Sequence, residues 1–231
     1  MGEMNKQGPD KIDWTDYTWN PISGCKHGCQ YCYMLRMESR FPGTMKPAFN
    51  PKRLHQPLSV KTPSLIFTGS SGDMWGEWVD KEWIDDVLDV CTALAPQHTY
   101  QFLTKNPSRY GDFYCIENGW YGTTVDGTEH TKKNINDLVY WAQAGMAGRF
   151  VSFEPLLAPV DPDLLGIQWV IIGANSNRSA KKPPKSWADT IIEKAREKDI
   201  PVFIKNNYGY PERIKEMPSN QSLNPTDKSA G

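Results

Sequence analysis

Three cysteines stand close together near the start of the chain, in the segment GCKHGCQYCYMLRMESR (24–40). Their spacing is Cys25-x3-Cys29-x2-Cys32. Iron–sulfur clusters are usually held by four thiolates, so three would leave one iron of a four-iron cluster without a protein ligand. An open coordination position distinguishes a reactive metal site from a structural one. The spacing therefore predicts a metal site that can bind a further ligand.

Zinc is the alternative occupant of this segment, because His27 lies between the first two cysteines. Structural zinc sites usually draw their ligands from two separated pairs, whereas here all four would come from one short loop. We therefore favour the cluster and interpret His27 as a loop residue beside it. The other two cysteines of the chain are expected to be core residues.

The segment resembles the motif of the radical S-adenosylmethionine (radical SAM) superfamily, with Tyr31 as the aromatic residue before the third cysteine. The resemblance implies a four-iron–four-sulfur cluster on Cys25, Cys29 and Cys32, and S-adenosylmethionine bound to the free iron. Reduction would then cleave the sulfonium to a 5′-deoxyadenosyl radical that abstracts hydrogen from a substrate. A ferredoxin or flavodoxin is implied as the electron donor. The cofactor supplies this chemistry, and the protein positions it and excludes water.

The resemblance also implies cofactor contacts outside the cysteine segment. The family usually has a Gly-Gly-Glu-like turn for the methionine amino group, and Ser71, Gly72 and Asp73 stand there with a different sequence. The remaining implied contacts are Lys105 at the methionine carboxylate, Thr123, Thr124 and Asp126 at the ribose, Asn175 and Ser176 at the adenine, and Tyr31 and Glu154 in the same site. Lys105 could equally form a structural ion pair.

A closer resemblance extends over most of residues 11–210. It is carried by KIDWTDYTWNPISGC, RLHQPL, QHTYQFLTKNPSRY, RFVSFEPLLAPVD and PVFIKN. These segments are similar to a family of bacteriophage and prokaryotic proteins of undefined function that has a three-cysteine motif and is grouped with radical SAM enzymes. This resemblance supports the cluster and names no substrate.

Short apolar runs alternate with helical patterns along the chain. Near-continuous runs of this kind are typical of parallel strands that are covered on both faces. The predicted strands are 18–23, 64–69, 99–105, 120–126, 149–155, 168–175 and 201–206. Pro21 suits an edge position for the first of them. We predict an α/β fold, an incomplete (β/α) TIM-like barrel with six to seven parallel strands, and keep an open doubly wound sheet as the alternative.

Polar residues follow nearly every predicted strand: Asp73, Lys105, Asp126, Glu154, Asn175 and Lys205. In a parallel barrel the carboxyl ends of the strands open on one face, where active sites lie. The pattern predicts a polar mouth and does not specify a reaction. An ordinary barrel hydrolase using Asp73 and Glu154 would leave the cysteines unexplained.

The totals suit a single soluble domain of 231 residues with a net charge of −1. We predict a loose N-terminal arm over 1–11, a domain over 12–210 and a polar tail over 211–231. No stretch has the ~20 apolar residues of a membrane span, and no signal peptide is evident. The expectation is a cytoplasmic protein with no membrane partner.

A non-catalytic function remains as the second class: a zinc- or cluster-stabilised module that binds nucleic acid. Its support is the loop NRSAKKPPK (177–185), which has four cations and two prolines. Cations in such a loop can contact phosphate, so a nucleotide or nucleic acid is the substrate class it would suit in an enzyme as well. The predicted substrate-binding residues are Lys205, Arg178, Lys181 and Lys182.

Overall fold

The computed structural model describes residues 3–9, 11–142, 146, 148–177 and 179–218. Its strands are β1 (Asn5–Lys6), β2 (Tyr17–Trp19), β3 (Ile22–Ser23), β4 (Ala48–Phe49), β5 (Leu65–Thr68), β6 (Thr99–Thr104), β7 (Gly119–Thr124), β8 (Gly148–Phe153), β9 (Trp169–Ile172) and β10 (Val202–Ile204). Its α-helices are α1 (Met34–Arg40), α2 (Pro51–Leu54), α3 (Lys81–Asp89), α4 (Asn134–Trp141) and α5 (Lys185–Arg196). Every predicted strand is therefore present, although 18–23 is divided at Asn20-Pro21 into β2 and β3.

Eight strands form one sheet in the order β1-β2-β5-β6-β7-β8-β9-β10. The short β1 is antiparallel to β2, and every other neighbouring pair is parallel. The predicted α/β class and mostly parallel sheet are confirmed. The order follows the chain without the reversal that defines a doubly wound sheet, so that alternative is wrong. Within the described residues no ladder joins β10 to β1, and the sheet is open rather than a closed barrel.

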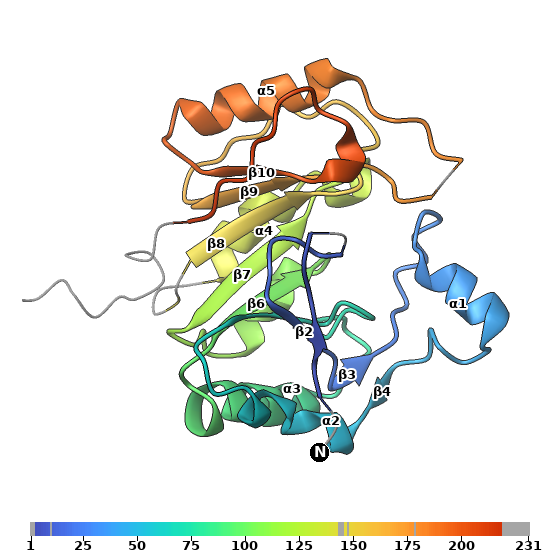
Figure 1. The fold of residues 1–231 in the computed structure, drawn as a ribbon, viewed down its shortest axis with the longest axis vertical. Helices are drawn as coiled ribbons and strands as arrows, with labels where there is room; N and C mark the ends of the chain where they lie inside the picture. Colours follow the sequence, from blue (N-terminus) through green and yellow to red (C-terminus); the bar gives the residue numbers. More distant parts are fainter. Residues whose placement is uncertain (1–2, 10, 143–145, 147, 178, 219–231) are drawn as a thin grey trace, which may run out of the picture.

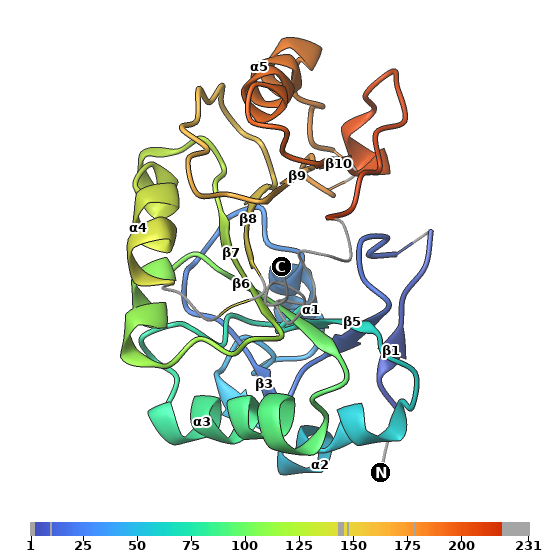
Figure 2. The same cartoon turned by 90° about the vertical axis from the view of Figure 1, so that its left-hand side faces the viewer.

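Helices α3, α4 and α5 lie in an arc along one face of the sheet (Figures 1 and 2). Their apolar sides, which include Ile84, Leu138 and Ile191, are fully buried in the main core. The opposite face has its own cluster of large side chains: Trp14, Phe67, Trp120, Phe150, Trp169, Ile171 and Phe203. Because strand residues alternate between faces, these rings fill the inner face and leave the carboxyl ends of the strands to polar groups.

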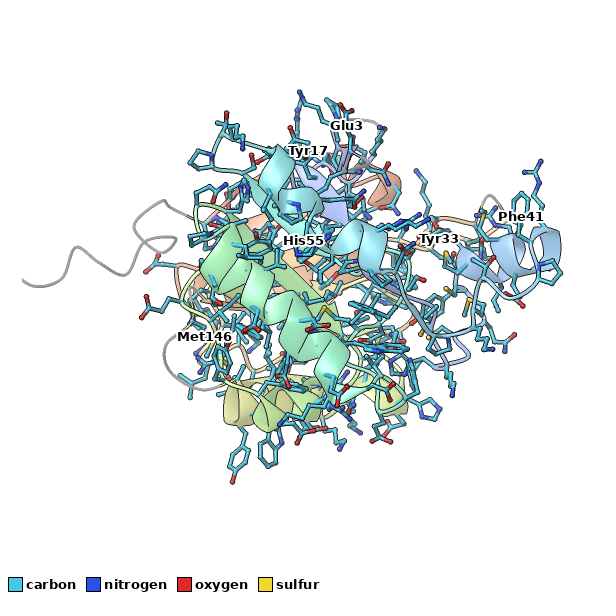
Figure 3. The ribbon with its side chains drawn as sticks, turned by 90° about the horizontal axis from the view of Figure 1, so that it is seen from below. Glu3, Tyr17, Tyr33, Phe41, His55 and Met146 are labelled. Carbon is cyan, nitrogen blue, oxygen red and sulfur yellow. The ribbon has the colours of Figure 1, made fainter. Side chains whose placement is uncertain are left out.

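The segment between β3 and β4 contains α1, which stands out from the body of the molecule beside the carboxyl ends of the strands (Figures 1 and 3). Its position follows from the β3–β4 hairpin, in which Ile22 pairs with Phe49. The hairpin closes the base of the excursion, and the cysteines and α1 lie between its two strands. No described helix has the length and apolar character needed to cross a bilayer.

The ends of the chain are more firmly placed than the sequence suggested. Met4 is buried, and β1 extends the sheet at the edge formed by β2. After residue 210 the chain runs antiparallel to β10, where Lys215 bridges Phe203. Glu216 binds Arg196 through two hydrogen bonds of 2.6 and 2.8 Å. Residues 3–9 and 211–218 of the predicted loose arm and tail are instead held by backbone pairing and ion pairs, and residues 1–2, 10 and 219–231 of these two predictions lie outside the described residues.

Candidate functional site

The cysteine segment is fixed to the sheet at its first residue. Gly24 and Gly72 form a parallel bridge, in which Gly24 N donates to Ser71 O at 3.1 Å and Asp73 N donates to Gly24 O at 3.3 Å. A Cβ on Gly72 would lie 2.5 Å from Gly24 O, so only glycine permits this approach. The backbone of Ser71 and Gly72 thus holds Cys25 at the end of β5.

All three thiols of the cysteine segment are partly buried. Burial chiefly raises the pKa of Cys25 to about 12, and the charges of Asp73, Cys29 and Cys32 add to the rise. No group of three His, Cys, Asp or Glu side chains in the described part of the chain has metal-binding geometry. The donor chemistry nevertheless fits an iron–sulfur cluster, because soft thiolates suit such metals. A cationic metal centre would also reverse the electrostatic penalty on the thiolates.

His27 links the cysteine segment to a buried carboxylate. Its Nε2 lies 2.8 Å from Asp73 Oδ2, and its ring packs edge-on against Trp78 with centroids 4.8 Å apart. Asp73 Oδ2 also accepts from Thr104 Oγ1 at 2.8 Å and Lys105 N at 3.0 Å. Asp73 Oδ1 accepts from a further backbone N–H. Asp73 therefore connects the ends of two strands to the cysteine loop and has little capacity left for a ligand.

Tyr31 makes a second link, to the end of β7. Its hydroxyl donates to Asp126 Oδ2 at 2.8 Å, and Lys105 Nζ lies 3.1 Å from the same oxygen. The lysine ammonium also lies 5.3 Å from the centre of the Tyr31 ring, within cation–π range. Three side chains that are far apart in the sequence thus form one charged cluster beside the cysteines.

The Asp126 carboxylate is held ionised by its neighbours. Its Oδ1 accepts from Thr128 Oγ1 at 2.6 Å, Thr128 N at 3.0 Å and Thr131 Oγ1 at 2.8 Å. Burial by itself would raise the pKa of Asp126, but the Thr128 bonds, the Lys105 charge and the Tyr31 hydroxyl lower it well below its usual range. The same contact, together with burial, raises the pKa of Tyr31. Tyr31 is therefore a neutral donor and Asp126 a permanent anion near neutral pH.

A cavity of about 480 Å³ lies against this cluster. Its walls come from the cysteine loop (His27, Gly28, Cys29, Gln30 and Tyr31), from the strand ends (Lys105 and Asp126) and from the loops beyond them (Thr128, His130, Thr131 and Leu157). This volume is within the range of small-molecule and cofactor sites. Cys29 is the cysteine that faces it.

Glu154 and Lys205 form an ion pair at the ends of β8 and β10. The intervening strand β9 is followed by Gly173, where a Cβ would lie 2.8 Å from Glu154 Cδ. The missing side chain therefore makes room for the pair. Both side chains are about one-fifth exposed, with relative accessibilities of 22% for Glu154 and 19% for Lys205.

The loop after β9 reaches back to the cysteine segment. Asn177 Nδ2 donates to Tyr31 O at 3.4 Å, and Asn177 N donates to Asn175 Oδ1 at 3.0 Å. Ser176 is exposed on the same loop. Residues from the first and last thirds of the domain therefore meet at the carboxyl edge of the sheet through Asn177, and the adenine contact predicted for Asn175 and Ser176 stays a prediction.

Other predicted positions have different surroundings. Thr123 is fully buried and donates to Thr104 O at 2.9 Å, so its hydroxyl serves strand pairing rather than a ligand. Thr124 is on the opposite, inner face and is 7% exposed. Lys181 and Lys182 are exposed, and Lys182 lies against Gly209. Arg178 lies outside the described residues.

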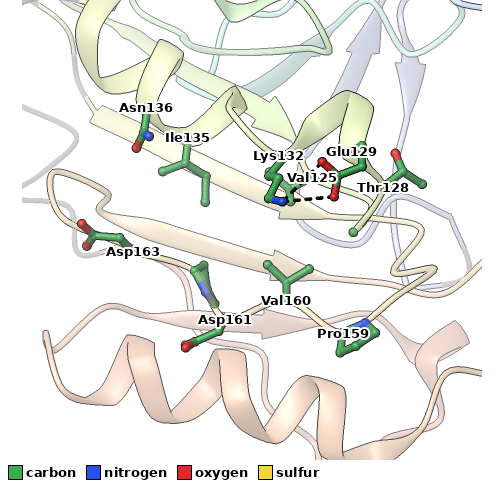
Figure 4. Close-up of a pocket in the computed structure, with 12 residues that line it drawn as sticks. Val125, Thr128, Glu129, Lys132, Ile135, Asn136, Pro159, Val160, Asp161 and Asp163 are labelled. Atoms are coloured by element: carbon green, nitrogen blue, oxygen red, sulfur yellow. Dashed lines mark hydrogen bonds and ion pairs between the residues drawn. The ribbon is translucent and has the colours of Figure 1, made fainter.

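A second cavity, of about 370 Å³, lies behind the short helix Glu129–Thr131 and contains none of the predicted site residues. Figure 4 shows Lys132 paired with Glu129 on one side of it and Asp161 and Asp163 on the other. The lining carries both signs of charge. We assign no function to it.

Seven residues that line the first cavity were not in the predicted site: His27, Gly28, Gln30, Thr128, His130, Thr131 and Leu157. Thr128 and Thr131 follow Asp126 at the spacing of a turn that caps a carboxylate, a signal that the sequence offers. His130 had no such signal in the sequence.

The comparisons with known proteins bear on the whole of this region. The model of the family DUF5131, described as a protein of unknown function, matches residues 9–225. The chain belongs to this family. No curated protein and no solved structure gives a significant match. The DUF5131 match includes the cysteine segment, all parallel strands and the segment that pairs with β10, so the candidate site lies entirely within the family region.

Proposed function

We propose that this DUF5131 protein is a radical SAM enzyme. The observation that supports the proposal best is the position of the cysteine loop. It is bound to the carboxyl end of β5 through Gly24 and Gly72 and forms one wall of a cavity of about 480 Å³. A three-thiolate loop beside a cavity of cofactor size suits a cluster with one open iron better than a structural metal, whose coordination is closed.

The fold that goes with this function is a partial (β/α) barrel. Strand order follows the chain, α3, α4 and α5 lie on one face, and aromatic side chains fill the other. In barrels of parallel strands, ligands bind at the carboxyl face. The polar cluster formed by Tyr31, Lys105 and Asp126 has this position.

In the proposed enzyme Cys25, Cys29 and Cys32 hold a four-iron–four-sulfur cluster. When bound and reduced, the cluster supplies the electron that cleaves S-adenosylmethionine to the 5′-deoxyadenosyl radical. The proposed enzyme requires an electron donor such as a ferredoxin or flavodoxin. We place the enzyme and this donor in the cytoplasm.

The protein's own residues orient the cofactor and keep water out. Lys105 uses one N–H on Asp126 and has others to offer a carboxylate. The Glu154–Lys205 pair and the backbone at Asn175 and Ser176 supply polar contacts at the β8–β10 end of the site. Asp73 and Asp126 act on the cofactor indirectly, since their oxygens hold the cysteine loop and Lys105 in place.

The test is anaerobic reconstitution with iron and sulfide. The expected product is brown, with broad absorption near ~400 nm from thiolate-bound iron. Cys25→Ala, Cys29→Ala and Cys32→Ala should each abolish the colour, and Cys115→Ala, on a separate segment, is the matched control. With S-adenosylmethionine and dithionite, the loaded protein should release 5′-deoxyadenosine and methionine.

The outcomes separate the alternatives. A colourless protein that binds one equivalent of zinc, lost in the same three variants, would refute the cluster. A brown protein that neither binds S-adenosylmethionine nor releases 5′-deoxyadenosine would refute the enzyme and leave a structural cluster in a binding module.

A further inference from the structure

One face of α1 combines apolar and basic side chains and points to solvent. Tyr33, Arg36, Met37, Arg40 and Phe41 recur at helical spacing, and all five are exposed. Residues three and four apart share a helix face, and an apolar stripe on such a face is normally buried against a core. Here Met37 is 38% and Phe41 55% exposed. Figure 3 shows Phe41 on the part of the molecule that stands farthest from the body.

The charge of this region differs from that of the chain as a whole. Between Cys25 and Lys46 there are four cations, Lys26, Arg36, Arg40 and Lys46, and none forms an ion pair within the described residues. The one carboxylate, Glu38, is occupied by backbone N–H groups of the following loop at 2.9 and 2.7 Å. The segment is therefore locally basic on a protein whose net charge is −1.

The helix is attached directly to the candidate site. Leu35 N donates to Cys32 O at 3.1 Å, so α1 continues from the third cysteine. The Tyr33 hydroxyl donates to Ser70 O at 2.8 Å and holds the start of the helix at the end of β5. On the far side of the site, the loop after β9 contacts Tyr31 and carries the exposed Lys181 and Lys182. Two basic surfaces thus flank the cavity.

We propose that the exposed face of α1 binds single-stranded nucleic acid and leads it to the cavity. Unpaired bases stack on exposed aromatic and apolar side chains, while neighbouring cations neutralise the phosphates. A duplex hides the faces of its bases and would use the cations alone. An anionic membrane could attract the same cations, but α1 has only seven residues and would bury little apolar area in a bilayer surface. As an assignment of substrate class this rests on the proposed function; as a binding surface it stands without it.

The test is fluorescence anisotropy with the full-length protein and a short labelled DNA strand. Arg36→Ala/Arg40→Ala should weaken binding about 10-fold and make the dependence of log K on log salt shallower by about 1.4, as expected for two lost phosphate contacts. Phe41→Ala should weaken binding by about 10-fold with no change in the salt slope, and Phe41→Trp should restore it. The matched control is Lys61→Ala/Lys198→Ala, which removes two exposed cations that precede β5 and β10, at the opposite edge of the sheet.

Several results would overturn the proposal: no binding to the strand, equal affinity for the matching duplex, or equal losses in the control and the α1 variants. The protein could also be sedimented with vesicles that contain phosphatidylserine. If vesicle binding depended on Phe41 and binding to the DNA strand did not, this face of α1 would be assigned to a membrane instead. Because anisotropy needs no radical chemistry, strand binding without release of 5′-deoxyadenosine would refute the proposed enzyme and retain this surface. The reverse pattern would refute the surface alone.

Discussion

Asp126 is the carboxylate on which the candidate site depends most, and Asp126→Asn tests that directly. The substitution keeps the shape of the side chain and removes its charge. One amide oxygen can still accept from Thr128 and Thr131. The amide nitrogen would then face Tyr31 and Lys105, both of which donate to this position in the wild type.

The expected cost follows from the geometry. Opposite charges 3.1 Å apart interact with about 5 kcal/mol at an effective dielectric constant of 20. The side chains of Lys105 and Asp126 are 17% and 6% exposed, so solvent compensates little of the loss. Part of the lost interaction energy is recovered, because the Lys105 ammonium can turn toward water in the variant. We expect the free energy of unfolding to fall by about 2–4 kcal/mol, near the range measured when one partner of a buried pair is removed.

Urea denaturation at several pH values is the assay. The folded state lowers the pKa of Asp126 from its ordinary value of 3.8. A carboxylate with a lowered pKa contributes stability that is complete above its unfolded pKa and is lost as the pH falls through its folded pKa. The difference between wild type and Asp126→Asn should therefore be constant from near neutral pH down to about pH 5 and shrink below about pH 4.

Asp161→Asn is the matched control. Asp161 is 75% exposed and lies 3.6 Å from Lys194, so its loss should cost less than about 0.5 kcal/mol. A cost for Asp126→Asn as small as that of the control, or a difference that already changes between pH 5 and neutral pH, would show that the Lys105–Asp126 pair is not the stabilising contact described here.

Two further substitutions test how the cysteine loop is held. Gly72→Ala should lower the free energy of unfolding in a urea titration by about 2–3 kcal/mol, because the added Cβ would lie 2.5 Å from a backbone oxygen. The control is Gly8→Ala, where the added Cβ would have no atom within 4 Å. It should change the free energy of unfolding by less than about 0.5 kcal/mol. His27→Ala should speed the loss of iron to a chelator by about 10-fold, since the contact with Asp73 supports the loop. Exposed His55 supplies the control variant His55→Ala, and equal rates in the two would contradict the supporting role of His27.

The strands could be predicted from the sequence because each is an apolar run with a polar residue at its end. Strand order also followed, since consecutive parallel strands with intervening helices usually lie side by side. The ends of the chain were mispredicted because periodicity detects elements that bury an apolar face. Met4 docks as one buried side chain, and Lys215 and Glu216 dock through backbone pairing and ion pairs with Asp13 and Arg196.

The candidate site was predictable in its location and less so in the role of each group. Asp73, Lys105 and Asp126 were expected at a polar mouth because each follows a strand, and as cofactor contacts because of the resemblance to radical SAM enzymes. Which polar side chain at a strand end pairs with another, and which remains free, depends on contacts between distant segments. The spacing of residues along one strand contains no information about these contacts between distant segments. His27 and Tyr31 showed no role of this kind in the sequence, because their partners lie 46 and 95 residues away.

These pairings divide the site into groups that hold it together and groups that remain free to bind. Asp73 and Asp126 each accept four or five hydrogen bonds from the protein itself, so a further donor would have to displace one. Lys105, His130 and Cys29 line the cavity and can offer donor or ligand atoms to it. A cofactor bound here would therefore meet cationic and thiolate groups, with the anions already neutralised behind them. That arrangement favours a ligand with an exposed carboxylate, such as the cofactor proposed above.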